Sequence, residues 1–178
     1  GTEDRIIIAT ALAQERGATL VPSFDDPHIV AGQGTTGLEL LAQSPEPIRQ
    51  ILVPTGGGGL AAGIALACPD ATVTCVEPEG WDDMGQSLRA GHIIPVGADA
   101  PATLCDALQT PRVSPITFAI LKAREAGAVA VDEDETRAAV HFAWHELRLV
   151  VEPGGAVALA ALLAGRVAPV PGTVAILS

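Results

Sequence analysis

Val53-Pro54-Thr55-Gly56-Gly57-Gly58-Gly59-Leu60 is the most informative part of this sequence. The apolar run at residues 51–53 leads into it and indicates a buried strand, and the small apolar residues 60–66 indicate a helix. Successive glycines let neighbouring backbone N–H groups turn toward one anion, because no Cβ stands in the way. The helix N-terminus adds free N–H groups and the positive end of a dipole. A tight turn needs only one or two glycines, so four in a row predict a phosphate site.

Two kinds of phosphate ligand fit this loop. Gly57-x-Gly59-x-x-Ala62 fits the dinucleotide fingerprint, and Glu77 follows the next apolar run, where a ribose-binding acid would stand. The alternative is a single phosphate monoester, as in pyridoxal phosphate. A nucleoside triphosphate is disfavoured, because no Gly-Lys-Ser/Thr follows the glycines. The loop alone leaves the first two alternatives open.

Composition narrows the class of protein. The 178 residues are 48% hydrophobic and 17% charged, which suits one domain with a sizeable core. The net charge of −11 would repel phosphate backbones and anionic membranes, so we expect neither nucleic acid nor a membrane as partner. Cys68, Cys75 and Cys105 are odd in number and lack C-x-x-C spacing, which predicts buried, reduced thiols in a cytoplasmic protein.

Strand-like and helix-like segments alternate along the chain, which predicts an α/β fold with a parallel sheet flanked by helices. Asp132-x-x-Glu135 resembles a capping box, and Thr2 is a candidate N-cap for the first helix. We expect strands at residues 18–21, 51–53, 72–76, 128–131 and 173–178, and helices at residues 2–17, 29–43, 60–66, 83–90, 115–126, 132–149 and 153–165.

The second helix contains Gly32, Gly34 and Gly37. Each glycine in a helix costs about 1 kcal/mol relative to alanine. Their presence therefore indicates close backbone packing or a nearby ligand, unless the helix starts only at Thr35 or Thr36.

Five segments, in order, resemble motifs of the threonine dehydratase and serine racemase family, the fold-type II pyridoxal-phosphate enzymes. They are Pro22-Ser23-Phe24-Asp25-Asp26-Pro27 with Ala31-Gly32-Gln33-Gly34-Thr35, the tetraglycine loop, Val76-Glu77-Pro78-Glu79, Val151-Glu152-Pro153-Gly154-Gly155-Ala156, and Ile176-Leu177-Ser178. The resemblance covers essentially the whole chain, as the C-terminal portion of such an enzyme. It favours pyridoxal phosphate as the ligand of the loop.

The resemblance implies site residues and a reaction. Residues 56–59 would hold the cofactor phosphate, Ser178 would hydrogen-bond the pyridine nitrogen, and Glu152 would lie close to the cofactor. The activity implied is an ammonia-lyase that converts threonine or serine to a 2-oxo acid and ammonia. A racemase or another hydroxy-amino-acid dehydratase is the near alternative. Alternatives of another class are a non-catalytic binding module and a nicotinamide dehydrogenase that uses Glu77.

The resemblance also implies a domain division. Residues 1–22 would be the last helix and strand of a small domain. Residues 23–178 would be a large cofactor domain that is incomplete at both ends. The resemblance also implies a homo-oligomeric enzyme with a small amino acid as substrate. The family's Schiff-base lysine would precede Gly1. Lys122 is the only lysine here and is expected at the surface, so we expect this chain alone to be inactive.

Two groups of side chains could hold a metal. Glu77, the Trp81 carbonyl and Asp83 match residues that hold Mg²⁺ or Ca²⁺ in some relatives; the alternative is that Asp82 only caps the following helix. His141 and His145 have a spacing that can suit zinc, but their apolar neighbours favour surface histidines.

Overall fold

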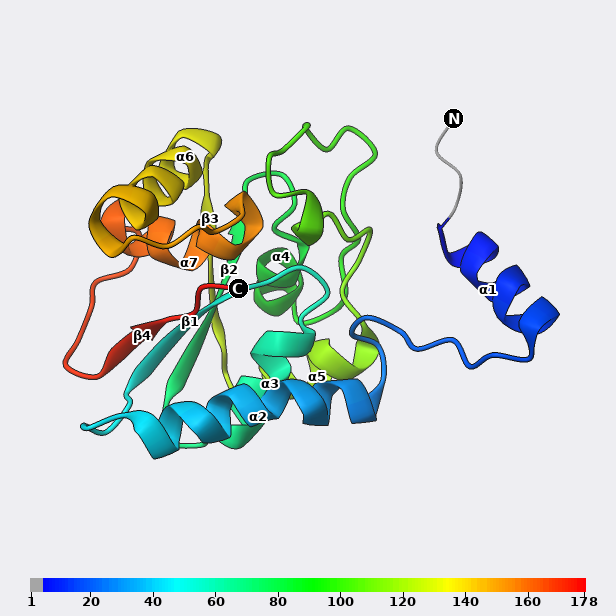
Figure 1. Cartoon of the computed structure of the whole chain (residues 1–178), viewed down its shortest axis with the longest axis horizontal. Coiled ribbons are helices and arrows are strands. Elements are labelled where there is room, and N and C mark those ends of the chain that lie inside the picture. The colour runs from blue at the N-terminus through cyan, green and yellow to red at the C-terminus, as the bar shows by residue number, and fades with distance from the viewer. Residues whose placement is uncertain (1–4) are drawn as a thin grey trace.

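A four-stranded parallel sheet organises the chain, in the strand order β3-β2-β1-β4 (Figure 1). The computed structural model describes residues 5–178. The strands are β1 (Gln50–Pro54), β2 (Thr72–Pro78), β3 (Gly127–Val131) and β4 (Thr173–Ala175). Gln50 of β1 pairs with Thr72 of β2 and with Thr173 of β4. The predicted α/β class with a parallel sheet is confirmed.

Helices cover both faces of this sheet (Figure 1). The α-helices of the body are α2 (Pro27–Gln43), α3 (Gly59–Ala67), α4 (Asp83–Ala90), α5 (Pro115–Ala123), α6 (Glu133–Phe142) and α7 (Pro153–Leu163). On one face α7 packs on β1, β2 and β3, with α6 outside it. On the other face α3 and α4 contact the strands, with α2 and α5 packed on α3. No helix within residues 5–178 has both the length and the apolar character to cross a bilayer.

The strands alternate between two hydrophobic clusters. Ile51, Val53 and Cys75 belong to the cluster on the α3 face, whereas Leu52 and Val76 belong to the cluster on the α7 face. Successive side chains of a strand point to opposite faces, so a strand covered on both sides is apolar throughout. This accounts for the continuous apolar run that predicted β1.

Glycines bring α2 and α3 into backbone contact. A Cβ on Gly63 would lie 2.5 Å from the Gly34 nitrogen and 2.6 Å from the Val30 oxygen. A Cβ on Gly37 would crowd the Cys68 sulfur at 3.1 Å, whereas Gly32 has nothing within 4 Å. Close packing therefore explains two of the three glycines.

The start of α2 decides between two expectations. The helix begins at Pro27, and the side chain of Asp26 accepts a hydrogen bond from the His28 N–H at 2.7 Å. The alternative start at Thr35 or Thr36 is therefore wrong.

The first helix, α1 (Arg5–Arg16), lies apart from the body of the molecule (Figure 1). It ends as predicted at Gly17, whose φ is +61°; the expected cap at Thr2 lies outside the described residues. The predicted strand at residues 18–21 is wrong, since these residues have no regular structure. A strand exists only by pairing, and within residues 5–178 nothing pairs with this segment.

The predicted capping box opens α6. The Asp132 side chain accepts from the Glu135 N–H at 2.8 Å, and the Glu135 side chain accepts from the Asp132 N–H at 2.9 Å. The helix expected to run to residue 149 instead changes to a π-helical turn at Ala143–Leu147. It ends at Arg148, which adopts a left-handed conformation with φ of 59°.

Candidate functional site

The carboxyl ends of the parallel strands meet at one edge of the sheet, where ligands of open α/β folds bind. The glycine loop follows β1 there, and Ser178 follows the neighbouring strand β4. Ser178 lies against the start of α7, because a Cβ on Gly155 would overlap the Ser178 carbonyl. Glu152 occupies the N-cap position of the same helix. The structure thus places residues 56–59, Ser178 and Glu152 on elements that converge on this edge.

Each of three loop glycines has a steric reason. Gly58 has φ of +89°, and a Cβ there would lie 2.6 Å from the Met84 Cε. A Cβ on Gly57 would overlap the ring of Phe24, and one on Gly56 would approach the Leu108 Cα at 3.2 Å. The loop is therefore packed so closely that side chains are excluded.

The N–H groups of the loop are available to a ligand. Within residues 5–178, the N–H groups of residues 56–59 donate to no protein acceptor. The nine-residue helix α3 starts at Gly59 and directs the positive end of its dipole to the same place. Free donors, a helix N-terminus and the absence of side chains fit a phosphate group.

Thr117 is a contact of this loop that sequence reasoning missed. It lies in the first turn of α5, is fully buried, and donates from Oγ1 to the Gly57 carbonyl at 2.7 Å. The two residues are 60 positions apart, so no local pattern links them. The one available signal was a threonine in a helix whose only other polar residue is Lys122.

Glu77 caps α4 from the end of β2. Its fully buried carboxylate accepts from the backbone N–H groups of Met84 at 2.9 Å and Gly85 at 2.8 Å. Asp82 holds the N-cap position but makes no side-chain cap; it accepts from Gln86 and pairs with Arg89 instead. The alternative in which Asp82 caps the helix is therefore wrong. Glu77 is fully buried and both of its oxygens accept from α4, so it is not exposed to bind a ribose. The dinucleotide alternative thereby loses the residue that supported it.

Two buried acids lie together near this cap. Burial raises the pKa of Glu77 to about 8, against the lowering effect of its two N–H donors, and burial raises the pKa of Asp83 to about 6. The Asp83 oxygens are buried without a hydrogen-bond partner in the described part of the chain; the Val113 N–H lies close enough to oppose the pKa rise in part. The Trp81 indole donates to the Pro101 carbonyl at 2.8 Å. No group of three His, Cys, Asp or Glu side chains in the described residues could hold a metal, so a cation here would need main-chain oxygens as well.

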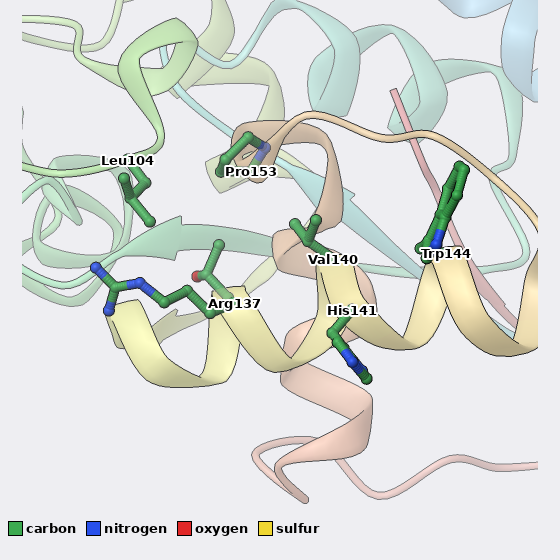
Figure 2. A pocket seen from close by; sticks show the side chains of 7 residues that line it. Leu104, Arg137, Val140, His141, Trp144 and Pro153 are labelled. Atoms are coloured by element: carbon green, nitrogen blue, oxygen red, sulfur yellow. The ribbon is translucent and has the colours of Figure 1, made fainter.

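A separate pocket of about 370 Å³ lies between α6, Leu104 and Pro153 at the start of α7 (Figure 2). Its lining is mostly apolar and consists of Leu104, Thr136, Arg137, Val140, His141, Trp144 and Pro153. Arg137 is already paired with Glu133 and Asp134. The exposed rings of His141 and His145 stack on each other with centroids 4.1 Å apart. The predicted surface position of both histidines is confirmed.

Two further predictions concern residues outside the glycine loop. Lys122 is exposed, as predicted, and its Nζ donates to the Gly91 carbonyl at 2.8 Å, at the opposite end of α5 from Thr117. Cys68, Cys75 and Cys105 are free thiols and buried, as predicted.

Comparison with known proteins agrees with this geometry. The pyridoxal-phosphate dependent enzyme family matches residues 1–178. An L-threo-3-hydroxyaspartate ammonia-lyase from Pseudomonas sp. is 39% identical over 165 residues, which are 90% of this chain and 51% of that protein. The solved structure of a threonine deaminase from T.th. has a TM-score of 0.85 at 42% identity, covering 93% of this chain and 62% of that one. The structure of maize serine racemase has a TM-score of 0.87 at 31% identity, and the match covers 99% of this chain and 55% of the racemase chain. The chain spans about half the length of the curated relatives it matches, and it belongs to the family of pyridoxal-phosphate-dependent enzymes.

Proposed function

We propose that this chain is the greater part of the cofactor domain of an ammonia-lyase that acts on a small hydroxy amino acid such as L-threonine or L-serine. The observation that carries the proposal is the glycine loop after β1, with its unpaired N–H groups at the start of α3. The relatives, which include ammonia-lyases for threonine and for 3-hydroxyaspartate, support the substrate class.

The proposed roles of the residues are those that the family resemblance implies, and the positions of the residues are compatible with them. The N–H groups of residues 56–59 would bind the phosphate and so fix one end of the cofactor. Ser178 would offer a neutral hydroxyl to the pyridine nitrogen, which suits α,β-elimination better than a carboxylate would. Glu152, at the N-cap of α7, would border the same space. When bound, the cofactor supplies the electron sink for the elimination, and the protein supplies binding and orientation.

The test uses the parent protein, defined as the natural gene product that contains residues 1–178. With L-threonine, L-serine and L-threo-3-hydroxyaspartate as substrates, the products measured would be ammonia and 2-oxo acid. With L-serine, formation of D-serine would be measured as well. Release of ammonia from one of the three supports the lyase. Formation of D-serine without ammonia supports a racemase, the alternative suggested by maize serine racemase. Cofactor binding without turnover would leave only the non-catalytic module.

A matched pair of variants tests the loop itself. Gly58→Ala places a Cβ against Met84 at a residue with positive φ, whereas Gly97→Ala adds one where nothing lies within 4 Å. We expect Gly58→Ala to weaken binding of pyridoxal phosphate at least about ten-fold, roughly 1.4 kcal/mol, and Gly97→Ala to leave it unchanged. Equal affinities would refute the assignment.

We also propose the domain division at residues 1–22 and 23–178, a homo-oligomeric parent protein and a cytoplasmic location. The separation of α1 from the body supports the division. The three buried free thiols support a reducing compartment. Proteolysis of the parent protein should cut first between α1 and α2.

A divalent cation, Mg²⁺ or Ca²⁺, is proposed at Asp83, the Trp81 carbonyl and Glu77, whose oxygens each keep a second lone pair besides the one that accepts from α4. The buried Asp83 carboxylate without a hydrogen-bond partner supports it, because such a group is costly unless something compensates its charge. A cation that binds only the folded state raises its stability by mass action. We expect EDTA to lower the melting temperature of the parent protein, added Ca²⁺ or Mg²⁺ to restore it, and Asp83→Asn to abolish the response. An unchanged melting temperature, with no metal by elemental analysis, contradicts the site.

A further inference from the structure

We propose that Thr117 is a positioning residue that fixes the Gly57–Gly58 peptide so that the Gly58 N–H faces the phosphate. This inference rests on the proposed cofactor site. Thr117 is fully buried in α5, and its Oγ1 donates to the Gly57 carbonyl at 2.7 Å. It therefore connects the first turn of one helix with the loop that opens another.

A threonine hydroxyl has one hydrogen to donate, and three acceptors compete for it. Gly57 O lies at 2.7 Å, Ser114 Oγ at 3.1 Å and Ser114 O at 3.2 Å from Thr117 Oγ1. The shortest contact takes the hydrogen. Ser114 Oγ accepts from the Thr117 N–H at 3.1 Å and can donate its own hydrogen to Thr117 Oγ1. The result is a directed chain from Ser114 through Thr117 to the loop carbonyl, in which each bond polarises the next.

The bond to the Gly57 carbonyl also fixes the direction of the Gly58 N–H. The Gly57 carbonyl and the Gly58 N–H belong to one trans peptide unit, so they point in opposite directions. Because Thr117 holds the carbonyl inward, the N–H of Gly58 faces away from α5. Within residues 5–178 this N–H meets no protein acceptor, which leaves it for an anion.

A loop of glycines needs a contact that fixes the orientation of its peptide groups. Glycine populates positive and negative φ about equally, so the peptide between Gly57 and Gly58 could turn over without a steric penalty from its own residues. Gly58 has φ of +89°, and its other close neighbour, the Met84 side chain, is apolar and cannot hold a carbonyl. In the described residues, Thr117 makes the only hydrogen bond to the Gly57 carbonyl.

The experiment removes the hydroxyl and compares ligands with and without a phosphate. In the apo form of the parent protein, Thr117→Val keeps the shape of the side chain and loses the bond, and Thr117→Ser keeps the bond. We expect Thr117→Val to weaken binding of pyridoxal phosphate and of inorganic phosphate about ten-fold. Binding of pyridoxal, which has no phosphate, should not change. Thr117→Ser should bind all three like the natural protein.

Two further variants separate the loop contact from general stability. Ser114→Ala removes the cap of α5 but leaves the 2.7 Å bond from Thr117 to Gly57. Thr136→Val removes another buried hydroxyl, which bonds Asp132 O at 2.9 Å and does not touch the loop. Both variants should have a lower melting temperature. Thr136→Val should nevertheless bind phosphate normally, and Ser114→Ala should lose less affinity for phosphate than Thr117→Val.

Each result decides for or against the inference. Equal weakening of pyridoxal and pyridoxal phosphate by Thr117→Val shows a purely structural role and overturns it, as does a Thr117→Ser protein that binds phosphate ten-fold worse. If Thr117→Val does not fold, Thr117→Ala carries the same comparison. A natural protein that binds neither pyridoxal phosphate nor inorganic phosphate overturns the proposed function itself. Phosphate binding that is unaffected by Thr117→Val overturns the role of Thr117 alone.

Discussion

Cys75 lies fully buried in β2, where burial raises the pKa of its thiol from 9.0 to about 12. The folded state therefore keeps the proton that the unfolded state releases near pH 9. The thiol stabilises the fold fully below pH 9, and its contribution is lost as pH rises from 9 toward 12. We expect the unfolding free energy of the parent protein to fall over this range, and to fall less in Cys75→Ala. Urea denaturation with reductant at pH 8, 9, 10 and 11 measures both slopes.

Val73→Ala is the control for this residue. Val73 is buried on the same strand and in the same hydrophobic cluster, but it has no titratable group. Its replacement should lower the unfolding free energy by the same amount at each pH. If Cys75→Ala and Val73→Ala give parallel curves against pH, the buried thiol does not contribute in the way described.

Single residues also mark how far the site could be predicted. The glycine loop was predicted because strand, glycines and helix are adjacent in sequence. The cap that Glu77 gives to α4 was missed, because Asp82 stands at the usual N-cap position and Glu77 reaches Met84 and Gly85 from a strand. Thr117 was missed because its hydrogen bond to Gly57 spans 60 positions, and no local pattern indicates such a contact.

At the scale of elements, the contact of α2 with α3 depends on Gly63. A Cβ there would lie 2.5 Å from the Gly34 nitrogen, which belongs to backbone and cannot move away cheaply. We expect Gly63→Ala to lower the unfolding free energy by about 1–3 kcal/mol, as overpacking does. Because α3 also carries the glycine loop, affinity for pyridoxal phosphate should fall with it. Chemical denaturation and cofactor titration of the parent protein measure the two effects.

Gly32→Ala is the matched control in the same pair of helices. Gly32 has open space within 4 Å, so alanine there should only improve helix propensity, by up to about 1 kcal/mol. A stable Gly63→Ala protein, or a destabilised Gly32→Ala protein, would contradict the packing described here.

Elements whose signals are local were predicted well, and so were the three strands whose apolar runs are buried between two helical layers. The bounds of α4 match those expected, because an acidic first turn and Gly91 mark its two ends. The capping box at Asp132 is equally local. The strand expected at residues 18–21 fails, because strand formation depends on a partner distant in sequence. The π-helical turn at Ala143–Leu147 had no sequence signal that we could identify.

At the scale of the whole molecule, the two ends of α5 have different surroundings. Thr117, near its start, contacts the glycine loop, whereas Lys122, near its end, donates to Gly91 O at 2.8 Å and lies 5.6 Å from the centre of the Phe118 ring. Lys122 is the only lysine in the 178 residues. The one lysine amine of these residues therefore lies on the surface, at the other end of the helix from the proposed phosphate site.

We therefore predict that residues 1–178 alone neither attach pyridoxal phosphate covalently at a lysine nor release ammonia from serine or threonine, because the chemistry of this cofactor needs a lysine amine beside its carbonyl. Borohydride reduction followed by peptide mass mapping should find no stoichiometric adduct on Lys122, and a Lys122→Arg variant should behave identically. Inorganic phosphate should still bind, since the backbone N–H groups of the loop and Thr117 all lie within residues 1–178. The parent protein, treated in parallel, should carry the adduct on a lysine outside this segment. A stoichiometric adduct on Lys122 together with turnover would contradict the prediction, because it would require α5 to bring its far end to the glycine loop.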